Sequence, residues 1–337
     1  MKKLIFGAFL LLGSCAGPTS HYSAAVSRMA VVGTNNPDSV NYFFSGISDF
    51  KVDSVGDLFV LDQITFTIKE FSPNGELITV FGKGGGGGPG EFRSPNAIAV
   101  DGGKVFVLDQ MLRRLTAFNA DGTLFGIMSG LEMMPSQIVA NMKLGLVFIV
   151  GYAISYDGPL VRVYRIDSSN HTFIYDTSIV ERYPEVTITR RTGNTDRIVM
   201  GQDNSIFYSE LYPYKIIRFT SNGKLIDEFE GPIKFSNPPV VEGPIVRSVS
   251  GSRGLTLLND SIVVNVVNDG NGDQFLDLFL VGGKWLCSIS SKEFGLSSFR
   301  HICGTRNGEI YLDIVDPVPL IIKYHVDLVP KNSGRIS

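Results

Sequence analysis

Oxygen-bearing side chains alternate in one short segment of this 337-residue chain, in a pattern that could hold a cation. Asp269, Asn271 and Asp273 occupy every second position, and Asp277 follows four residues later. Calcium loops present oxygen ligands in this alternating way, although an EF-hand also has a glycine at its sixth position, a glutamate at its twelfth and flanking helices. Those features are missing from this segment, and a polar turn between two strands explains the same residues. A calcium site and a turn are therefore two interpretations of it.

Three other carboxylates stand at equivalent places in a repeated pattern. In each copy an acidic residue precedes a phenylalanine by nine positions, and that phenylalanine precedes a glycine by four. The copies are Asp62–Phe71–Gly75, Asp109–Phe118–Gly122 and Glu210–Phe219–Gly223. If the repeat units form a closed ring, carboxylates at equivalent places would gather at one end of its central channel, where they could hold a metal. An aspartate at the end of a strand more often accepts backbone N–H groups of the adjoining loop, and we expect that role here.

Other catalytic patterns do not occur in the sequence. The four histidines, His21, His171, His301 and His325, lack metal-ligand spacing, and no GxSxG nucleophile motif is present. The glycine-rich run 82–90 carries Lys83 ahead of its glycines and leads into a strand, whereas a phosphate-binding loop opens a helix. We interpret this run as a flexible connection between two repeat units.

Turns and apolar runs define the elements that must position these residues. Nearly continuous apolar runs, such as 58–61 and 105–108, predict short strands that are buried on both faces. A repeat of about 45 residues built from short strands is typical of a solenoid or a propeller. Six hairpin turns predict six such units of four strands each. These turns are Val55-Gly56, Gly102-Gly103, Leu144-Gly145, Asp203-Asn204, Asn259-Asp260 and Asn307-Gly308.

The two ends of the chain predict how the ring closes. The sixth unit stops after its third strand, 320–329, and has no fourth strand of its own. The strand-like segment 24–33 precedes the first unit and belongs to none of the six. We expect this segment to supply the missing outer strand, so that the two termini latch the ring and leave no open edge.

A set of residues in the first two units carries a family resemblance: Phe81-Gly82, the run from Gly84 to Phe92 that ends PGEF, Pro95, Ile98, Val100-Asp101, Val105 to Asp109, Phe118 and Gly122. On these residues the first two units resemble NHL-type repeats, and the whole chain resembles the six-bladed β-propeller lipoproteins of bacteria. The resemblance implies an all-β fold, a six-bladed β-propeller of four-stranded antiparallel blades closed by an N-terminal strand. It implies no particular activity, because propellers host many unrelated functions. Units three and five lack the acidic residue, with Gly151 and Asn268 near its place, and Asp313 falls about one residue early in unit six.

The N-terminus predicts export and lipid anchoring. Lys2 and Lys3 precede an apolar run, 4–12, which is too short to span a bilayer and has the length of a signal-peptide core. Residues 12–15, Leu-Gly-Ser-Cys, resemble a bacterial lipobox and make Cys15 the predicted lipidation site; an ordinary signal peptide is the alternative. Several acyl chains on Cys15 would give stable anchoring. The predicted organisation is a signal peptide (1–14), a lipidated tether (15–23), a propeller (24–330) and a C-terminal tail (331–337).

Composition narrows the range of partners. The formal net charge is −3 and no basic patch occurs, which argues against nucleic-acid binding. Cys287 and Cys303 could form a disulfide in an exported protein, or could remain as two buried thiols. We expect a monomer held by its lipid on the periplasmic side of the outer membrane, because no acidic cluster follows Cys15.

Function is expected in the loops at one mouth of the ring. Tyrosine and arginine are common in binding hot spots, and loops on a rigid scaffold are where function concentrates. The predicted partner-binding residues are Arg113, Tyr152, Tyr156, Tyr212 and Tyr214. They predict a binding or scaffold module for a protein or glycan partner, without a cofactor. The alternative is a calcium-dependent hydrolase of the lactonase or lyase type, with its metal in the channel mouth.

Overall fold

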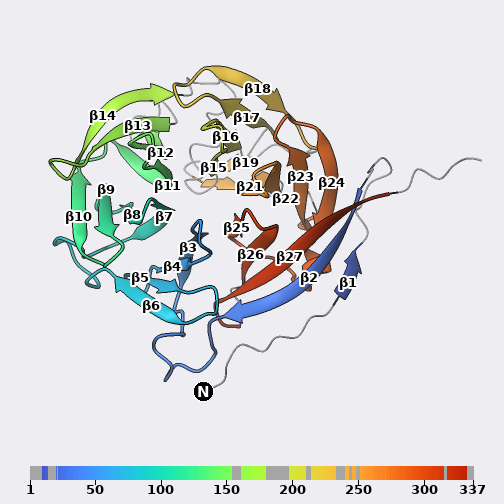
Figure 1. Cartoon of the computed structure of the whole chain (residues 1–337), viewed down its shortest axis with the longest axis horizontal. Coiled ribbons are helices and arrows are strands. Elements are labelled where there is room, and N and C mark those ends of the chain that lie inside the picture. The colour runs from blue at the N-terminus through green and yellow to red at the C-terminus, as the bar shows by residue number, and fades with distance from the viewer. Residues whose placement is uncertain are drawn as a thin grey trace, which may run out of the picture.

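Among the described residues, six large sheets, the blades, are arranged radially around a central axis (Figure 1). The computed structural model describes residues 10–13, 20, 22–153, 161–179, 197–209, 214–232, 240–242, 245–247, 251–269, 271–314 and 317–331. Each sheet has four antiparallel strands in sequential order from the inside outwards, and the sixth has one more strand at its rim. The all-β six-bladed propeller predicted from the sequence is confirmed.

Each blade takes its strands in chain order, and only the sixth draws on both ends of the chain. Blade 1 comprises β3 (Ile47–Val52), β4 (Leu58–Asp62), β5 (Thr67–Phe71) and β6 (Leu77–Phe81). Blade 2 comprises β7 (Pro95–Asp101), β8 (Lys104–Asp109), β9 (Arg114–Asn119) and β10 (Leu124–Ser129). Blade 3 comprises β11 (Met133–Asn141), β12 (Leu146–Ala153), β13 (Val161–Asp167) and β14 (Thr172–Ile179). Blade 4 comprises β15 (Arg197–Met200), β16 (Ile206–Ser209), β17 (Ile216–Phe219) and β18 (Leu225–Phe229).

The second half of the ring adds a small hairpin and a short helix. The hairpin, β19 (Val240–Glu242) and β20 (Ile245–Arg247), lies between blades 4 and 5 in the chain. Blade 5 comprises β21 (Gly251–Leu258), β22 (Ile262–Asn268), β23 (Gln274–Leu280) and β24 (Trp285–Ser290), followed by the 3-10 helix η3 (Ser291–Phe294). Blade 6 comprises β25 (Ile302–Gly304), β26 (Glu309–Ile314), β27 (Leu320–Pro330) and β2 (Tyr22–Val32), with β1 (Leu10–Gly13) beside β2. No helix in these described parts of the chain is long and apolar enough to cross a membrane.

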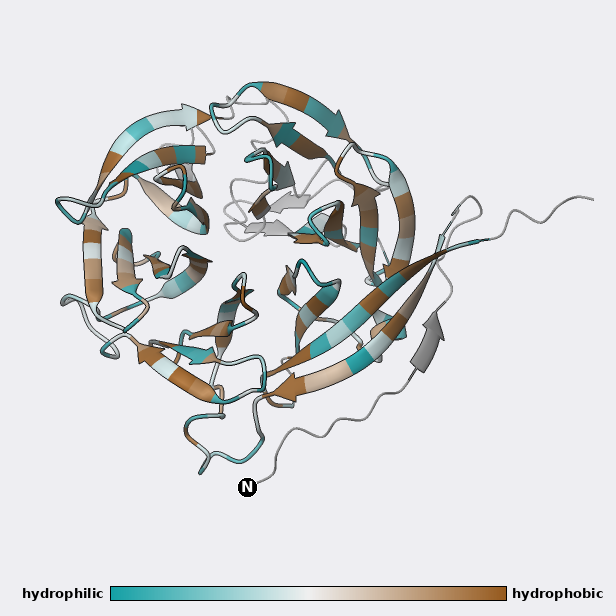
Figure 2. Ribbon diagram, viewed as in Figure 1, coloured by the Kyte–Doolittle hydropathy of each residue, from teal (hydrophilic) through white to brown (hydrophobic). Residues whose placement is uncertain are grey.

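Both faces of each blade are buried, as the continuous apolar runs predict. Among the described residues, the buried hydrophobic side chains form six clusters, one at each junction between neighbouring blades. Strand β4 shows the reason: Leu58 and Val60 pack in the cluster shared with blade 6, whereas Phe59 and Leu61 pack in the cluster shared with blade 2. Figure 2 shows these hydrophobic residues along the strands and hydrophilic residues in most of the turns. Burying each such side chain contributes about 1.5–3 kcal/mol.

The phenylalanine and glycine of the repeated pattern have packing and turn roles. Phe71 and Phe118 are buried within their inter-blade clusters, and Phe219 is buried in blade 4. Gly75 and Gly122 lie in the turn before the outer strand, with φ of 78° and 81°. Backbone in this region strains any residue with a Cβ, so the turn itself requires glycine.

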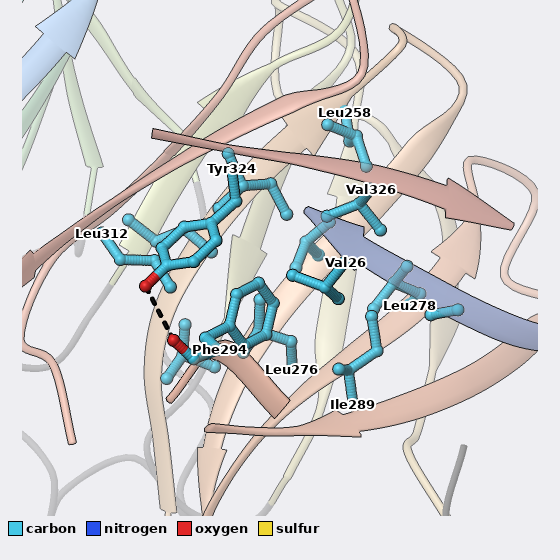
Figure 3. Close-up of a cluster of buried hydrophobic side chains, with 14 of the residues drawn as sticks. Val26, Leu258, Leu276, Leu278, Ile289, Phe294, Leu312, Tyr324 and Val326 are labelled. Atoms are coloured by element: carbon cyan, nitrogen blue, oxygen red, sulfur yellow. Dashed lines mark hydrogen bonds between the residues drawn. The ribbon is translucent and has the colours of Figure 1, made fainter. Parts of the chain in front are cut away.

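Blade 6 is closed by both ends of the chain, as predicted. Strand β2 pairs with β27 from Tyr22 opposite Pro330 to Val32 opposite Ile321, beginning two residues before the predicted segment. Val26 and Val326 from these strands pack over blade 5 (Figure 3). The Tyr324 hydroxyl donates a hydrogen bond to the Phe294 carbonyl at 2.8 Å (Figure 3). The terminal strands therefore seal the junction between the last two blades.

Polar side chains on the innermost strands link the first three blades. β-Bulges at Ser48 in β3 and Asn96 in β7 interrupt the pairing with the second strand of each blade. The Ser48 hydroxyl donates to the Pro95 carbonyl at 3.1 Å, and the Asn96 amide donates to the Pro135 carbonyl at 3.0 Å. Each bond joins one blade to the next. The side chains at the bulges thus connect the innermost strands of neighbouring blades by hydrogen bonds.

The glycine-rich connection from β6 to β7 is held in one shape by a buried arginine. The Arg114 guanidinium donates hydrogen bonds to the carbonyls of Gly87, Gly88 and Glu91. Lys83 donates its backbone N–H to the Gly90 carbonyl at 2.7 Å. The run is a connection between blades, as predicted, and its carbonyls serve as acceptors for Arg114.

Cys287 and Cys303 are both buried thiols. Cys287 packs in the cluster between blades 5 and 6, whereas Cys303 packs in the cluster between blades 6 and 1. Of the two alternatives left by the sequence, the structure has the pair of thiols.

Candidate functional site

One face of the ring carries the connections that vary most between blades. In antiparallel blades, the loops between second and third strands share a face with the connections from one blade to the next. We call this the crossover face. The opposite face carries the short hairpin turns. The chain is longest between blades where β14 is followed by β15 and where β18 is followed by β21, with the hairpin β19–β20 between them.

The repeated aspartates are loop caps on the crossover face. Asp62 is fully buried and accepts backbone N–H groups of Ser45 and Ile64 at 2.7 and 2.9 Å. Asp109, also fully buried, accepts those of Arg93 and Leu112 at 2.7 and 2.9 Å. Each carboxylate therefore joins the entrance of its blade's first strand to the loop after the second strand. The predicted capping role is confirmed for both residues.

Asp313 performs the same task in blade 6. Its carboxylate accepts the backbone N–H groups of Arg300 and His301 at 2.8 and 2.7 Å, and its second oxygen lies 2.8 Å from His301 Nδ1. Burial alone would raise its pKa, but these hydrogen bonds outweigh burial and hold the pKa of Asp313 below its ordinary value. Asp313 therefore caps its loop although it falls about one residue early in the sequence pattern. Glu210, the third predicted carboxylate, lies outside the described residues.

The predicted calcium segment forms a turn in which its own groups are partnered. Asp269 Oδ1 accepts the backbone N–H groups of Asn271 and Asp273, both at 2.9 Å. Asp273 pairs with Lys292 at 2.8 Å. Asp277 lies within β23, opposite Asn265, so the structure groups it with other partners. Within the parts of the chain that the structure describes, no three His, Cys, Asp or Glu side chains gather as a metal site.

Asp277 instead forms a buried polar cluster with Tyr214 across the junction of blades 4 and 5. The Tyr214 hydroxyl donates to Asp277 Oδ2 at 2.7 Å, and the Ser288 hydroxyl donates to Oδ1. Asn265 also hydrogen-bonds Tyr214 and accepts from the Ser252 hydroxyl at 2.7 Å. Tyr214 is only 5% exposed, which corrects the prediction that it offers a binding surface at the mouth. Its ring points into the junction, where the carboxylate holds it.

Burial dominates the electrostatics of this cluster. Desolvation raises the pKa of Asp277 to about 6, although the hydrogen bonds from Ser288 and Tyr214 act in the opposite direction. Desolvation and the neighbouring Asp277 also raise the pKa of Tyr214, so its hydroxyl stays protonated and donates. Gly231 completes the cluster, because a Cβ there would lie 2.0 Å from the Tyr214 ring. The cluster therefore holds Gly231, at the start of the connection that follows β18.

A cleft of about 410 Å³ opens on the crossover face between the outer parts of blades 2 and 3. Its lining comes from the end of β10, the connection 130–132, the start of β13 and the end of β14. The lining residues are Met128, Ser129, Gly130, Leu131, Glu132, Arg162, Tyr164, Tyr175 and Ser178. The cleft therefore combines charged, hydroxyl-bearing and apolar groups at a junction that rigid strands define.

The charged groups of the cleft form a pair, and its aromatic rings form another. Arg162 Nη1 lies 3.0 Å from Glu132 Oε2, with side chains 15% and 81% exposed respectively. Burial alone would lower the pKa of Arg162, but hydrogen bonds to Glu132 and Tyr164 outweigh it and raise that pKa. The rings of Tyr164 and Tyr175 lie 5.9 Å apart at 73°, and the Tyr175 hydroxyl bonds Ser178 Oγ at 2.8 Å. Burial raises the pKa of Tyr164, which keeps its hydroxyl neutral.

The structure describes only some of the predicted partner-binding residues, and it places them in different surroundings. Arg113 is exposed on the crossover face, and its carbonyl accepts the backbone N–H of Leu131 in the cleft wall at 3.0 Å. Tyr152 lies in β12 opposite Met134, and its side chain lies outside the described residues, as do Tyr156 and Tyr212 altogether. Only Arg113, among the five, is placed beside the cleft by the described structure.

Sequence reasoning missed the residues that line the cleft, because it searched loops and these residues lie largely in strands. A signal was available at Asn170 and His171, which lie in the turn between β13 and β14. A hairpin centred there brings its two flanking strands together, and the structure pairs Tyr164 with Tyr175 in that register. No sequence pattern places Glu132, from the preceding connection, beside Arg162.

Comparisons with known proteins agree with this architecture. A family model described as "6-bladed beta-propeller" matches residues 41–227. Among solved structures, a Bacteroides fragilis protein described as exported is similar with a TM-score of 0.60 and 10% identity, covering 92% of this chain and 98% of that one. The virginiamycin B lyase of Staphylococcus aureus is similar with a TM-score of 0.52 and 14% identity, covering 95% and 99%. At such identities the likeness concerns the fold alone. No curated protein matches the chain.

Proposed function

Because the chain belongs to the 6-bladed beta-propeller family, we propose that it is an exported, lipid-anchored propeller with NHL-type repeats that binds a protein or glycan partner through its crossover face. The observation that carries the proposal is the cleft between blades 2 and 3. It offers paired charges, two tyrosine rings and hydroxyl groups on a face where connections differ from blade to blade. Binding sites commonly combine an apolar lining with a few placed polar groups in this way.

Rigidity supports a binding role for this surface. Arg162 and Tyr164 lie in β13, whose opposite face packs against blade 4. Tyr175 lies in the neighbouring strand β14. Their backbones are therefore fixed by the blade, and little conformational entropy is lost when a partner docks. Tyrosine adds a large contact area with few rotatable bonds, which is why it is common in binding hot spots.

The anchoring half of the proposal rests on Cys15. Replacing it, as Cys15→Ala, is expected to move the protein from the membrane fraction to the soluble fraction, because lipid chains on that sulfur and its α-amine provide the membrane affinity. Fractionation of expressing cells followed by immunoblotting measures this. A Cys15→Ala protein that stays with the membrane would overturn the lipid anchor.

The binding half is tested with Tyr175→Ala. We expect the immobilised full chain to capture a protein or carbohydrate component of cell-envelope extract, and Tyr175→Ala to lower that capture about tenfold, the effect of removing a hot-spot side chain. Quantitative mass spectrometry and carbohydrate analysis of the bound fraction measure it. Ile78→Ala is the matched control, because Ile78 is similarly exposed, at 51%, on the outer strand of blade 1.

Two results would count against this proposal. Equal capture by Tyr175→Ala and the unaltered chain would remove the cleft from the function. Capture that EDTA abolishes and calcium restores, together with turnover of a lactone, would favour the calcium-dependent hydrolase instead.

A further inference from the structure

The described residues that line the cleft between blades 2 and 3 provide one cation, one anion, two phenol rings and two serine hydroxyls, and this set is selective in its chemistry. We propose that the cleft binds a neutral sugar unit of a glycan through Arg162, Glu132 and Tyr175. This inference rests on the proposed binding function and names the class of its ligand. Four properties of the described residues lead to it.

The first property is size. The cleft's volume, about 410 Å³, lies in the range of sites for small ligands, which is about 300–1,000 Å³. It can therefore enclose one or two sugar rings, whereas a folded protein partner would contact its rim.

The second property is the adjacent donor and acceptor. Arg162 offers only N–H donors and Glu132 only acceptor oxygens, and the two groups lie 3.0 Å apart. A pair of neighbouring sugar hydroxyls can accept from the guanidinium and donate to the carboxylate at the same time. Because Glu132 is 81% exposed, its ion pair with Arg162 is worth little to stability, and the groups can rearrange around a ligand.

The third property is charge balance. A carboxylate of an acidic sugar or an acidic peptide that approached Arg162 would meet Glu132 beside it, and a cationic group that approached Glu132 would meet Arg162. The two charges compensate each other, and no further Lys, Arg, Asp or Glu belongs to the lining that the described residues provide. A neutral ligand therefore fits the cleft better than a charged one.

The fourth property is the aromatic wall. Tyr175 is 54% exposed and stands at 73° to the buried ring of Tyr164, so a large part of its ring is open to a ligand. A ring face is apolar at its centre and suits the C–H face of a pyranose, while the phenol hydroxyl beside Ser178 remains available for hydrogen bonds. Met128 adds apolar surface at the same cleft. Peptides are more commonly held by an open strand edge or an apolar groove.

The test is calorimetric titration of the purified, detergent-solubilised full chain with defined probes. The neutral probes are gluco-, manno-, galacto- and xylo-oligosaccharides; the charged probes are an oligogalacturonate and an aspartate-rich peptide. We expect at least one neutral series to bind, and Tyr175→Ala to weaken it about tenfold or more. Thr177→Ala, an exposed change in the same strand outside the cleft, should leave the affinity unchanged.

Glu132→Gln separates a neutral ligand from an acidic one. It removes the negative charge from an exposed side chain, so the fold is preserved. It is expected to weaken the neutral sugar about threefold to tenfold, because the amide supplies one acceptor oxygen in place of two. An acidic probe would instead bind more tightly to Glu132→Gln.

The outcomes are distinguishable from failure of the binding function itself. Binding of the oligogalacturonate or the peptide alone, or no binding by any neutral series, overturns the sugar inference. If Tyr175-dependent capture from envelope extract persists in that case, the proposed binding function stands without it. If no neutral sugar binds and Tyr175→Ala does not reduce capture, both the sugar inference and the proposed binding function are overturned.

Discussion

Replacing Asp109 by alanine is expected to lower the free energy of unfolding by about 3 kcal/mol or more, because it leaves backbone N–H groups of two loops without their acceptor. Asp109 is fully buried and accepts hydrogen bonds from the backbone of Arg93, Ser94 and Leu112. Without the carboxylate these donors must reach water or remain unsatisfied. Urea unfolding, followed by circular dichroism, measures the change.

Two further variants give this prediction its control. Asp121→Ala removes an exposed aspartate that caps the hairpin turn of the same blade through Thr123, and is expected to lower the stability far less than Asp109→Ala, because water can replace the lost acceptor. Asp109→Asn keeps one acceptor oxygen but turns an amide donor towards a backbone N–H, so an intermediate loss is expected. A stable Asp109→Ala protein that has lost only activity would show that the carboxylate acts in chemistry instead of holding loops.

Asp277→Asn is expected to raise the free energy of unfolding above pH 6 and to remove part of the pH dependence of stability. The pKa of Asp277 is raised to about 6 by burial, so the folded protein retains a proton that the unfolded chain has lost. Stability therefore falls as pH rises from about 4 to about 6, and the loss persists above that window. A difference of roughly 2 between the folded and unfolded pKa corresponds to about 3 kcal/mol, which is the largest gain expected for Asp277→Asn at pH 8.

The quantity to compare is the free energy of unfolding of the variant minus that of the unaltered chain at each pH. We expect Asp277→Asn to gain stability progressively between pH 4 and pH 7 in urea unfolding. Asp313→Asn is the control, because hydrogen bonds lower the pKa of Asp313 and its contribution is lost only as pH falls below about 4; the Asp313→Asn difference should therefore stay constant between pH 4 and pH 7. A constant difference for Asp277→Asn across this range would contradict the assignment.

The sequence was sufficient for features that depend on neighbouring residues in the chain. Asn-Gly and Asp-Gly turns need positive φ, and uninterrupted apolar runs need two buried faces, so six four-stranded units follow from local chemistry. The missing fourth strand of the last unit, set against a spare strand at 24–33, predicted the closure that β2 and β27 make. The caps at Asp62 and Asp109 were predictable for the same reason, because each acts on loops of its own blade.

Contacts between blades were decided by the tertiary structure alone. Tyr214 and Asp277 are far apart in the chain and meet only because blades 4 and 5 pack together, which turned an expected surface tyrosine into a buried donor and removed Asp277 from the turn at Asp269. Asp313 stands one residue early in the sequence pattern, yet its carboxylate accepts the backbone N–H groups of Arg300 and His301 and so keeps the capping role.

The sequence by itself determined the ring of this protein, and the tertiary structure decided its site. Turn chemistry and strand burial are encoded within about ten residues, so each blade can be predicted separately. The cleft draws Glu132 from one connection and Arg162 and Tyr175 from two strands of the next blade. The hairpin between β13 and β14 brings Arg162 and Tyr175 onto neighbouring strands. Nothing in the spacing brings Glu132 to Arg162, because their proximity depends on how the connection from blade 2 packs against blade 3.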